Sequence, residues 1–187
     1  MITIGVDEVG RGCWAGPLVA GAVALHETIP NLRDSKKLSK VLRTKLDIII
    51  REQALAFGLG WVWPAEIDEH GLSWAVKTAM ERAMATMPQL LKYDQIIIDG
   101  NVNYFAGNPM ARAIIKADDC VPAASAASII AKVARDAYMA KAAEQYAGYG
   151  FESHVGYGTA AHITALKTLG ATDLHRHSYR PIRELLA

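Results

Sequence analysis

Two adjacent carboxylates, Asp7 and Glu8, follow the short apolar run Ile-Thr-Ile-Gly-Val at the start of the chain. Like charges this close raise each other's pKa, so the pair needs a compensating partner. Asp99 follows a second apolar run, and Asp118 with Asp119 follows a third. Acids after strands are common turn residues, but three such sites in one small sheet indicate a ligand site, because ligands of α/β sheets bind beyond the carboxyl ends of strands.

Four converging carboxylates could bind hard divalent cations through oxygen ligands. Mg²⁺ or Mn²⁺ suits such a donor set better than metals that prefer thiolate or imidazole. Two such cations about 4 Å apart can activate a water and stabilise the leaving oxygen of a phosphodiester. The acid pattern therefore predicts hydrolysis of phosphodiesters with divalent metals.

The spacing of Asp7 and Glu8 raises a geometric problem, since adjacent side chains of a regular strand point to opposite faces. We therefore expect the strand to end or bulge at this pair, and Gly10 and Gly12 favour such a turn. The alternative, a dinucleotide-binding loop at Gly10-x-Gly12-x-x-x-Gly16, misses the required spacing by one residue. Two carboxylates before that loop would also repel a pyrophosphate.

The elements that must position these acids follow from the apolar periodicity, which predicts one α/β domain over residues 1–187 with a mixed five-stranded sheet flanked by helices. The predicted strands cover 2–6, 17–25, 56–63, 94–100 and 112–116. The predicted helices cover 38–55, 64–87 with a break near Gly71, 121–146 and 159–169.

The composition is that of a globular protein, with 51% hydrophobic and 21% charged residues. No run approaches the roughly 20 apolar residues that span a bilayer, so we expect no membrane association. Cys13 and Cys120 lack any paired spacing, which argues against a disulfide framework and favours the cytoplasm. The net charge is only +1, but residues 33–51 carry seven basic residues against two acids. This segment is either a solvated helix face or a phosphate-contacting patch.

Seven motifs resemble those of the ribonuclease HII family, and they follow one another in the family's order over nearly the whole chain. They are DEVGRG at 7–12, AGPLVAGAV at 15–23, DSKKLS at 34–39, IIIDGN at 96–101, VPAASAASIIAKVARD at 121–136, GYGT at 156–159 and HRHSYRPI at 175–182. The resemblance implies a ribonuclease H-like fold. It also implies an endonuclease that cuts the RNA strand of RNA–DNA hybrids and cuts 5′ of single ribonucleotides in duplex DNA. The products would carry 3′-hydroxyl and 5′-phosphate ends.

The resemblance further implies the residues of the site. Asp7, Glu8, Asp99 and Asp118 would bind Mn²⁺ or Mg²⁺, with Asp136 as the alternative to Asp118. The substrate contacts would be Gly10, Arg11 and Gly12 at the ribose, Tyr157 on the neighbouring sugar, and Lys36 and Lys37 on phosphates. The family's activity implies roles in ribonucleotide excision repair and RNA primer removal, and we expect a monomer.

Two positions depart from the family pattern: Ala117 stands where glycine is common, and Val155 stands where lysine is common. The late histidines His154, His162, His175 and His177 lack zinc-like spacing, and we expect them at the surface or near phosphates. Two rival functions remain open, a metal-dependent nuclease or phosphatase without ribose preference and a binding module with structural acids. Four strand-end acids fit a mere binder poorly because they would repel phosphates.

Overall fold

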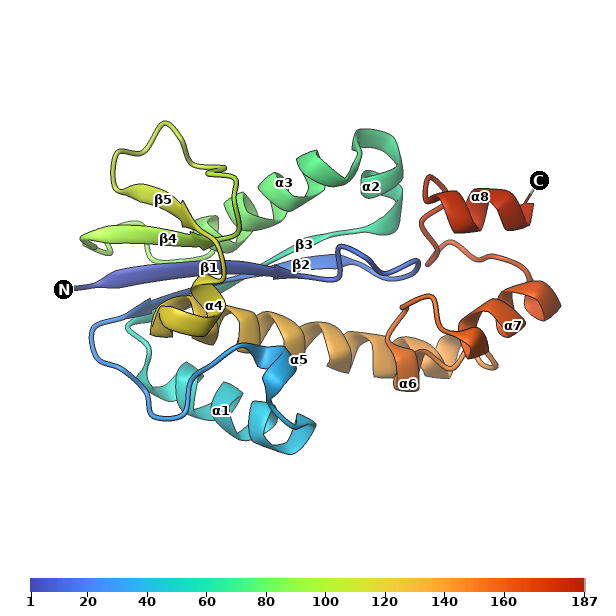
Figure 1. Ribbon diagram of the computed structural model, residues 1–187, viewed down its shortest axis with the longest axis horizontal. Helices are drawn as coiled ribbons and strands as arrows, with labels where there is room; N and C mark the ends of the chain where they lie inside the picture. Colours follow the sequence, from blue (N-terminus) through green and yellow to red (C-terminus); the bar gives the residue numbers. More distant parts are fainter. Residues whose placement is uncertain (187) are drawn as a thin grey trace.

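A mixed five-stranded sheet lies at the centre of the structure, a computed structural model that describes residues 1–186, and helices cover both of its faces (Figure 1). The strand order is β3-β2-β1-β4-β5. The strands are β1 (Thr3–Val9), β2 (Leu18–Leu25), β3 (Ala56–Val62), β4 (Gln95–Asp99) and β5 (Ala111–Ile114). β2 is antiparallel to β1 and β3, whereas β1, β4 and β5 run parallel. The carboxyl ends of β1, β4 and β5 therefore lie at one edge.

The helices form two layers, with α2 and α3 on one side of the sheet and α5, α4 and α1 on the other (Figure 1). Their bounds are η1 (Ser35–Lys37), α1 (Lys40–Gln53), α2 (Pro64–His70), α3 (Leu72–Ala85), α4 (Ala117–Cys120), α5 (Pro122–Gln145), α6 (Phe151–His154), α7 (Ala160–Leu169) and α8 (Arg180–Leu186). Local chemistry explains several ends. The Ser39 side chain accepts from Leu42 N at the start of α1, and Gly71, with φ of 82°, separates α2 from α3.

The five predicted strands and the four predicted helices are all present, with shifts at their ends. The break near Gly71 is confirmed by the boundary between α2 and α3. Two expectations were wrong. The first strand runs on through the acidic pair to Val9 in regular register, with Asp7 opposite Gly21 and Glu8 opposite Ala20. The fifth strand ends at Ile114, so Asp118 lies on the short helix α4 rather than at a strand end.

The regular strand assigns the two acids to different faces of the sheet. Ile4 and Val6 pack in the core cluster that includes residues of α3, whereas Gly5 faces the backbone of α5. Because side chains alternate along a strand, Asp7 lies on the α5 face and Glu8 on the α3 face. The pairing with β2 holds this alternation, so the glycines after the pair turn the chain without bringing the two carboxylates to one face.

The backbone of α5 packs directly against the backbone of the sheet. A Cβ at Gly5 would meet the backbone of Ala123 and Ala124, and one at Gly21 would meet the carbonyl of Ala127. The alanine-rich start of α5 and these glycines let the backbones approach directly. None of the helices within the described residues is long and apolar enough to cross a membrane.

Substitution at Gly5 tests this contact. Gly5→Ala should lower the free energy of unfolding by about 3 kcal/mol because the new methyl group meets helix backbone that cannot rotate away. Gly107→Ala is the control, since a Cβ there meets nothing within 4 Å, and it should change stability by less than about 0.5 kcal/mol. Urea denaturation of both variants gives the comparison. Equal stability of the two would contradict the tight packing of α5 on β1.

Candidate active site

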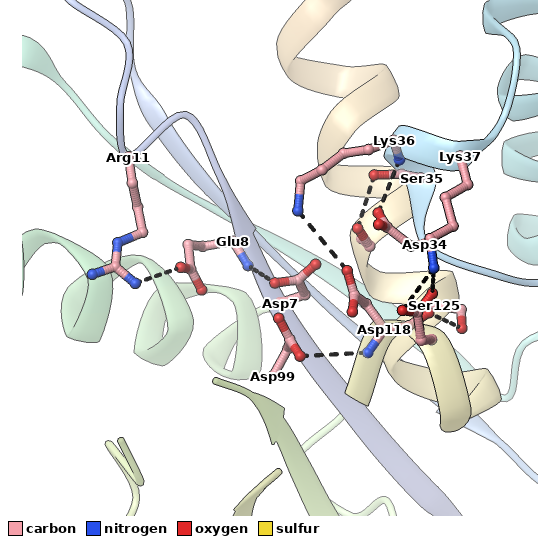
Figure 2. Close-up of polar contacts among 12 residues, drawn as sticks. Asp7, Glu8, Arg11, Asp34, Ser35, Lys36, Lys37, Asp99, Asp118 and Ser125 are labelled. Atoms are coloured by element: carbon pink, nitrogen blue, oxygen red, sulfur yellow. Dashed lines mark hydrogen bonds and ion pairs between the residues drawn. The ribbon is translucent and has the colours of Figure 1, made fainter. Parts of the chain in front are cut away.

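Three carboxylates from separate elements meet at the edge of the sheet where β1 and β4 end (Figure 2). Asp7 comes from β1, Asp99 from the last position of β4, and Asp118 from α4, and one oxygen of each lies within 4.8 Å of the others. Asp7 and Asp118 are buried, with 4% and 5% of their surface exposed. The sequence-predicted convergence of these three acids is therefore present in the fold.

The position of Asp118 depends on how α4 is attached to α5. Lys116 takes the left-handed conformation, with φ of 60°, and turns the chain from β5 into α4. The Ser125 hydroxyl then donates to the Asp118 carbonyl at 2.7 Å. The Asp118 amide also faces Asp99, with 3.4 Å between its nitrogen and Oδ1 of that carboxylate. These contacts bring the Asp118 carboxylate back to the sheet edge.

Burial and neighbouring carboxylates disfavour the charged forms of Asp7 and Asp118. Burial, with the charges of Glu8 and Asp99, raises the pKa of Asp7 well above its usual value. Burial and the charge of Asp99 raise the pKa of Asp118 to about 6. The Lys36 ammonium, 3.9 Å from Asp118, offsets only part of this effect, and a divalent cation would supply further positive charge. The donors are carboxylate oxygens held close together, which fits Mg²⁺ or Mn²⁺ and not a metal that requires sulfur or imidazole.

Glu8 lies beside the three acids but outside their group. Its Oε1 accepts from Nη1 of Arg11 at 3.2 Å, and its side chain projects away from Asp118 (Figure 2). Burial raises the pKa of Glu8, the Arg11 guanidinium lowers it, and the charge of Asp99 adds a smaller increase. The carboxylate is therefore close enough to act on the site electrostatically, while its role as a metal ligand stays a prediction.

Asp136, the alternative fourth acid, is not brought into the group. It lies on α5 two turns beyond Ser128 and pairs with Lys132 at 2.9 Å. Asp119, next to Asp118, instead binds Lys37 through two contacts of 2.6 and 2.8 Å. Asp118 is therefore the acid that joins Asp7 and Asp99. Asp119 and Asp136 each form an ion pair with a lysine instead.

The η1 segment lies over the mouth of the site and contacts it through two hydroxyls. Ser35 Oγ lies 2.9 Å from Ser128 Oγ of α5, and the Ser128 side chain lowers the pKa of Asp7 against the effect of burial. Lys36 extends toward the acids, with its Nζ 3.9 Å from Oδ2 of Asp118 (Figure 2). Lys36 and Lys37, both predicted to contact phosphates, thus flank the acidic site.

The turn Gly10-Arg11-Gly12 is held from behind by a buried guanidinium. Arg176 Nη1 donates to the Arg11 carbonyl at 3.1 Å, and the Tyr179 hydroxyl donates to the same oxygen at 2.7 Å. Gly10 has φ of 94°, and a Cβ there would meet the Arg135 side chain, whereas a Cβ at Gly12 would meet nothing within 4 Å. The turn is therefore fixed on its inner side and open at Gly12.

A second buried guanidinium joins the loop before β2 to the loop that carries Tyr157. Arg135 donates to the carbonyls of Pro17, Ala15 and Val155 at 2.8, 3.0 and 2.9 Å. Val155 has φ of 45°, a strained value for a β-branched residue that its surroundings must hold. Tyr157 follows with 39% of its surface exposed, and the Lys132 ammonium lies 5.9 Å from its ring centre.

The expectation for the histidines was wrong at three of four positions. His154, His162 and His175 are buried, and His154 stacks on His162 with 4.5 Å between ring centres. His177 alone of the four is exposed. The rings lie against Tyr149 and Phe151, and this aromatic packing, which depends on the path of residues 149–175, could not be derived from their spacing.

Sequence reasoning also missed Arg135, Arg176 and Ser128 as residues that support the site. All three lie within motifs that carry the family resemblance, which was the available signal. A buried arginine is rare unless paired, and these two guanidinium groups bind backbone carbonyls of loops that only the fold brings near.

The fold and the site together define a ribonuclease H-like hydrolase. Two solved structures share the fold over nearly their full length. Ribonuclease H2 from Pyrococcus horikoshii has a TM-score of 0.81 at 28% identity, covering 99% of this chain and 97% of that one. A chain in the PCNA:RNase HII complex from Archaeoglobus fulgidus has a TM-score of 0.79 at 26% identity, covering 96% of each.

The chain belongs to the ribonuclease HII family, whose model matches residues 4–182. Ribonuclease HII of Nitrosococcus oceani is 46% identical over 184 residues, covering 97% of this chain and 90% of that protein. Ribonuclease HII of Halorhodospira halophila is 44% identical over 183 residues, covering 98% and 94%. Membership confirms the resemblance seen in the motifs and implies divalent-metal-dependent endoribonuclease activity on RNA–DNA hybrids.

Metal binding by the substrate-free protein should depend on pH because a bound cation must displace the proton of a carboxyl group. With the pKa of Asp118 at about 6, Mn²⁺ affinity should be highest above pH 6 and should fall by up to about tenfold per pH unit below it. Calorimetric titration at pH 5.5 and 7 measures this. Asp118→Asn should weaken binding and reduce the pH dependence to the part that Asp7 contributes, whereas Asp136→Asn should do neither. The reverse pattern would assign the ligand to Asp136.

Proposed function

We propose that this protein is an endoribonuclease that cuts the RNA strand of RNA–DNA hybrids and cuts 5′ of single ribonucleotides in duplex DNA. The observation that carries the proposal is the close group of Asp7, Asp99 and Asp118, two of them buried, beside an open glycine turn. The acids supply a site for Mn²⁺ or Mg²⁺, and the turn supplies backbone that can approach a sugar. The same arrangement supports roles in ribonucleotide excision repair and RNA primer removal.

The chain's own residues would hold and orient the reactants. Asp7, Asp99 and Asp118 would bind the metal, and Glu8 would complete the ligand set from the opposite side of β1. When bound, a pair of divalent ions supplies water activation and stabilises charge on the leaving oxygen. A new bond from the water oxygen to phosphorus would form as the bond to the 3′ oxygen of the preceding nucleotide breaks. The products would be a 3′-hydroxyl and a 5′-phosphate.

Recognition of the ribonucleotide would come from the turn and the tyrosine loop. A 2′-hydroxyl both donates and accepts hydrogen bonds, which lets a protein distinguish RNA from DNA. The open backbone at Gly12, with Gly10 and Arg11, would read that hydroxyl, and Tyr157 would pack on the adjacent sugar. Lys36 would exchange Asp118 for a backbone phosphate once a cation neutralises that carboxylate, and Lys37 would exchange Asp119 for another phosphate. We further propose that the enzyme acts as a monomer in the cytoplasm.

A cleavage assay tests the metal-ligand assignment. Asp7→Asn and Asp99→Asn should abolish cleavage of a duplex that carries one ribonucleotide, in Mg²⁺ or Mn²⁺, because each removes a charge that holds the cation. Glu81→Gln is the control, since Glu81 lies exposed on α3 and pairs only with Lys77 among the described residues, and it should cleave as the wild type does. EDTA should stop all cleavage. Near wild-type turnover by either Asn variant would refute the assignment.

Gly12→Ala tests the ribose-reading turn. The methyl group has open space in the free protein, so Tm should stay within about 2 °C of wild type. The same group would stand where the sugar approaches, and KM for the single-ribonucleotide duplex should rise about tenfold or more, equivalent to about 1.4 kcal/mol. Gly107→Ala serves as the control. An all-DNA duplex cut as fast as the ribonucleotide substrate would instead favour a nuclease without ribose preference.

A further inference from the structure

A partly buried lysine of α5, Lys132, lies beside the loop that carries Tyr157. Its side chain is 14% exposed, and its Nζ lies 2.9 Å from Oδ1 of Asp136 on the same helix. The same Nζ lies 5.9 Å from the centre of the Tyr157 ring. The ammonium is therefore held at a defined place next to the tyrosine that is predicted to pack on a sugar.

The face of α5 that carries Lys132 also carries two serines of the acidic site. Ser125, Ser128 and Lys132 stand at positions i, i+3 and i+7, which lie on one face of a helix. The Ser125 hydroxyl donates to the Asp118 carbonyl, and the Ser128 hydroxyl contacts η1. The lysine follows one turn further, about 6 Å along the helix axis. This face of α5 thus leads from the acids toward Tyr157.

The contacts between the sheet and α5 place the lysine at the same intermediate level. Asp7 pairs with Gly21, and a Cβ at Gly21 would meet the carbonyl of Ala127. Three residues beyond Asp7, a Cβ at Gly10 would meet the side chain of Arg135. The segment of α5 that starts beside the acids therefore ends beside the glycine turn. The lysine lies between these two levels.

The ammonium of Lys132 keeps hydrogen-bonding capacity for a ligand. An ammonium group has three N–H donors, and the contact with Asp136 uses one of them. Over residues 1–186 this group makes no second hydrogen bond. Two donors therefore remain for an anion that enters beside Tyr157, a residue with 39% of its surface exposed.

The proposed reaction would bring one particular phosphate to this point. Cleavage 5′ of a ribonucleotide places the phosphate on its 5′ side at the carboxylates and its ribose at Gly12. The sugar at Tyr157 is then the one on the 3′ side, because the metal site occupies the 5′ side. The phosphate between these two sugars would lie between the turn and the tyrosine, where the Lys132 ammonium is.

We propose that Lys132 binds the phosphate on the 3′ side of the ribonucleotide, and that Asp136 holds the ammonium in place for this contact. The proposal rests on the proposed function for the order of the groups along the substrate strand. It adds a phosphate contact inside the site to those of Lys36 and Lys37 at its mouth. The alternative is an ion pair that only stabilises α5, as lysine and aspartate at i and i+4 can do.

Two nicked duplexes isolate this phosphate. In both, one strand ends in a 3′-terminal ribonucleotide, and the next strand begins at the following nucleotide with either a 5′-phosphate or a 5′-hydroxyl. For the wild type in saturating Mg²⁺, KM for release of the ribonucleotide should be about tenfold higher without the phosphate, because a charge-assisted hydrogen bond is lost. Equal KM values of the wild type for the two duplexes would overturn the proposal.

The double variant Lys132→Met with Asp136→Asn removes the ion pair without changing the net charge, so it separates the phosphate contact from the general electrostatics of the site. Its KM for the phosphorylated duplex should rise about tenfold, with kcat within about threefold of wild type. Loss of the phosphate should then change its KM less than about threefold, since the two changes remove the same contact. A response to the phosphate equal to that of the wild type would refute the contact. Lys132→Gln serves in the same comparison if the double variant does not fold.

Lys77→Gln with Glu81→Gln is the matched control, because it removes an i, i+4 ion pair from α3 on the other side of the sheet (Figure 1). It should keep the wild-type KM and the wild-type response to the phosphate. A wild-type protein that cleaves neither duplex would contradict the proposed function. Fluorescence anisotropy of the same two duplexes tests the phosphate contact without cleavage, and the same ratios are expected for the dissociation constants.

Discussion

Mutual repulsion among Asp7, Asp99 and Asp118 is the constraint on which the rest of the structure depends. Their oxygens lie within 4.8 Å of one another, and two of the three side chains are buried. Hydrophobic packing must hold them there in the absence of a cation, and it does so through the contact of α5 with β1 and of α4 with β4. A divalent cation would turn this repulsion into attraction. The same close spacing that raises the carboxyl pKa values gives the cation several oxygen ligands.

Binding of a nucleic-acid substrate would also require a cation to neutralise these carboxylates. Uncompensated carboxylates repel a polyanionic duplex, and the neighbouring lysines are engaged by acids, Lys36 with Asp118 and Lys37 with Asp119. A cation bound by Asp118 would make the Lys36 ammonium available to a phosphate, whereas Lys37 pairs with Asp119, outside the group of three carboxylates. The proposed metal site and the proposed phosphate contact of Lys36 would therefore share the ion pair between Lys36 and Asp118.

Buried donors hold the carbonyls of the loops that are predicted to contact the substrate. Arg135 and Arg176 bind the carbonyls of residues 11, 15, 16, 17 and 155, and His162 binds that of residue 157. Buried carbonyls of irregular loops need such partners, since they have no strand or helix to supply one. These buried donors therefore set the position of the groups that are predicted to contact the sugar, although they lie away from the carboxylates.

The sequence alone determined the α/β class, the strands, the long helices and the identity of the acids, because apolar periodicity and strand-end carboxylates are local patterns. Motifs spread over nearly the whole chain also indicated the family. The tertiary structure decided which carboxylates meet. Regular pairing with β2 sends Asp7 and Glu8 to opposite faces, and the turn at Lys116 brings Asp118 back to Asp99 while Asp136 stays on the flank of α5. It also decided that three histidines are buried and that two arginines hold loop carbonyls, since both facts depend on contacts between residues more than ten positions apart, which no local pattern encodes.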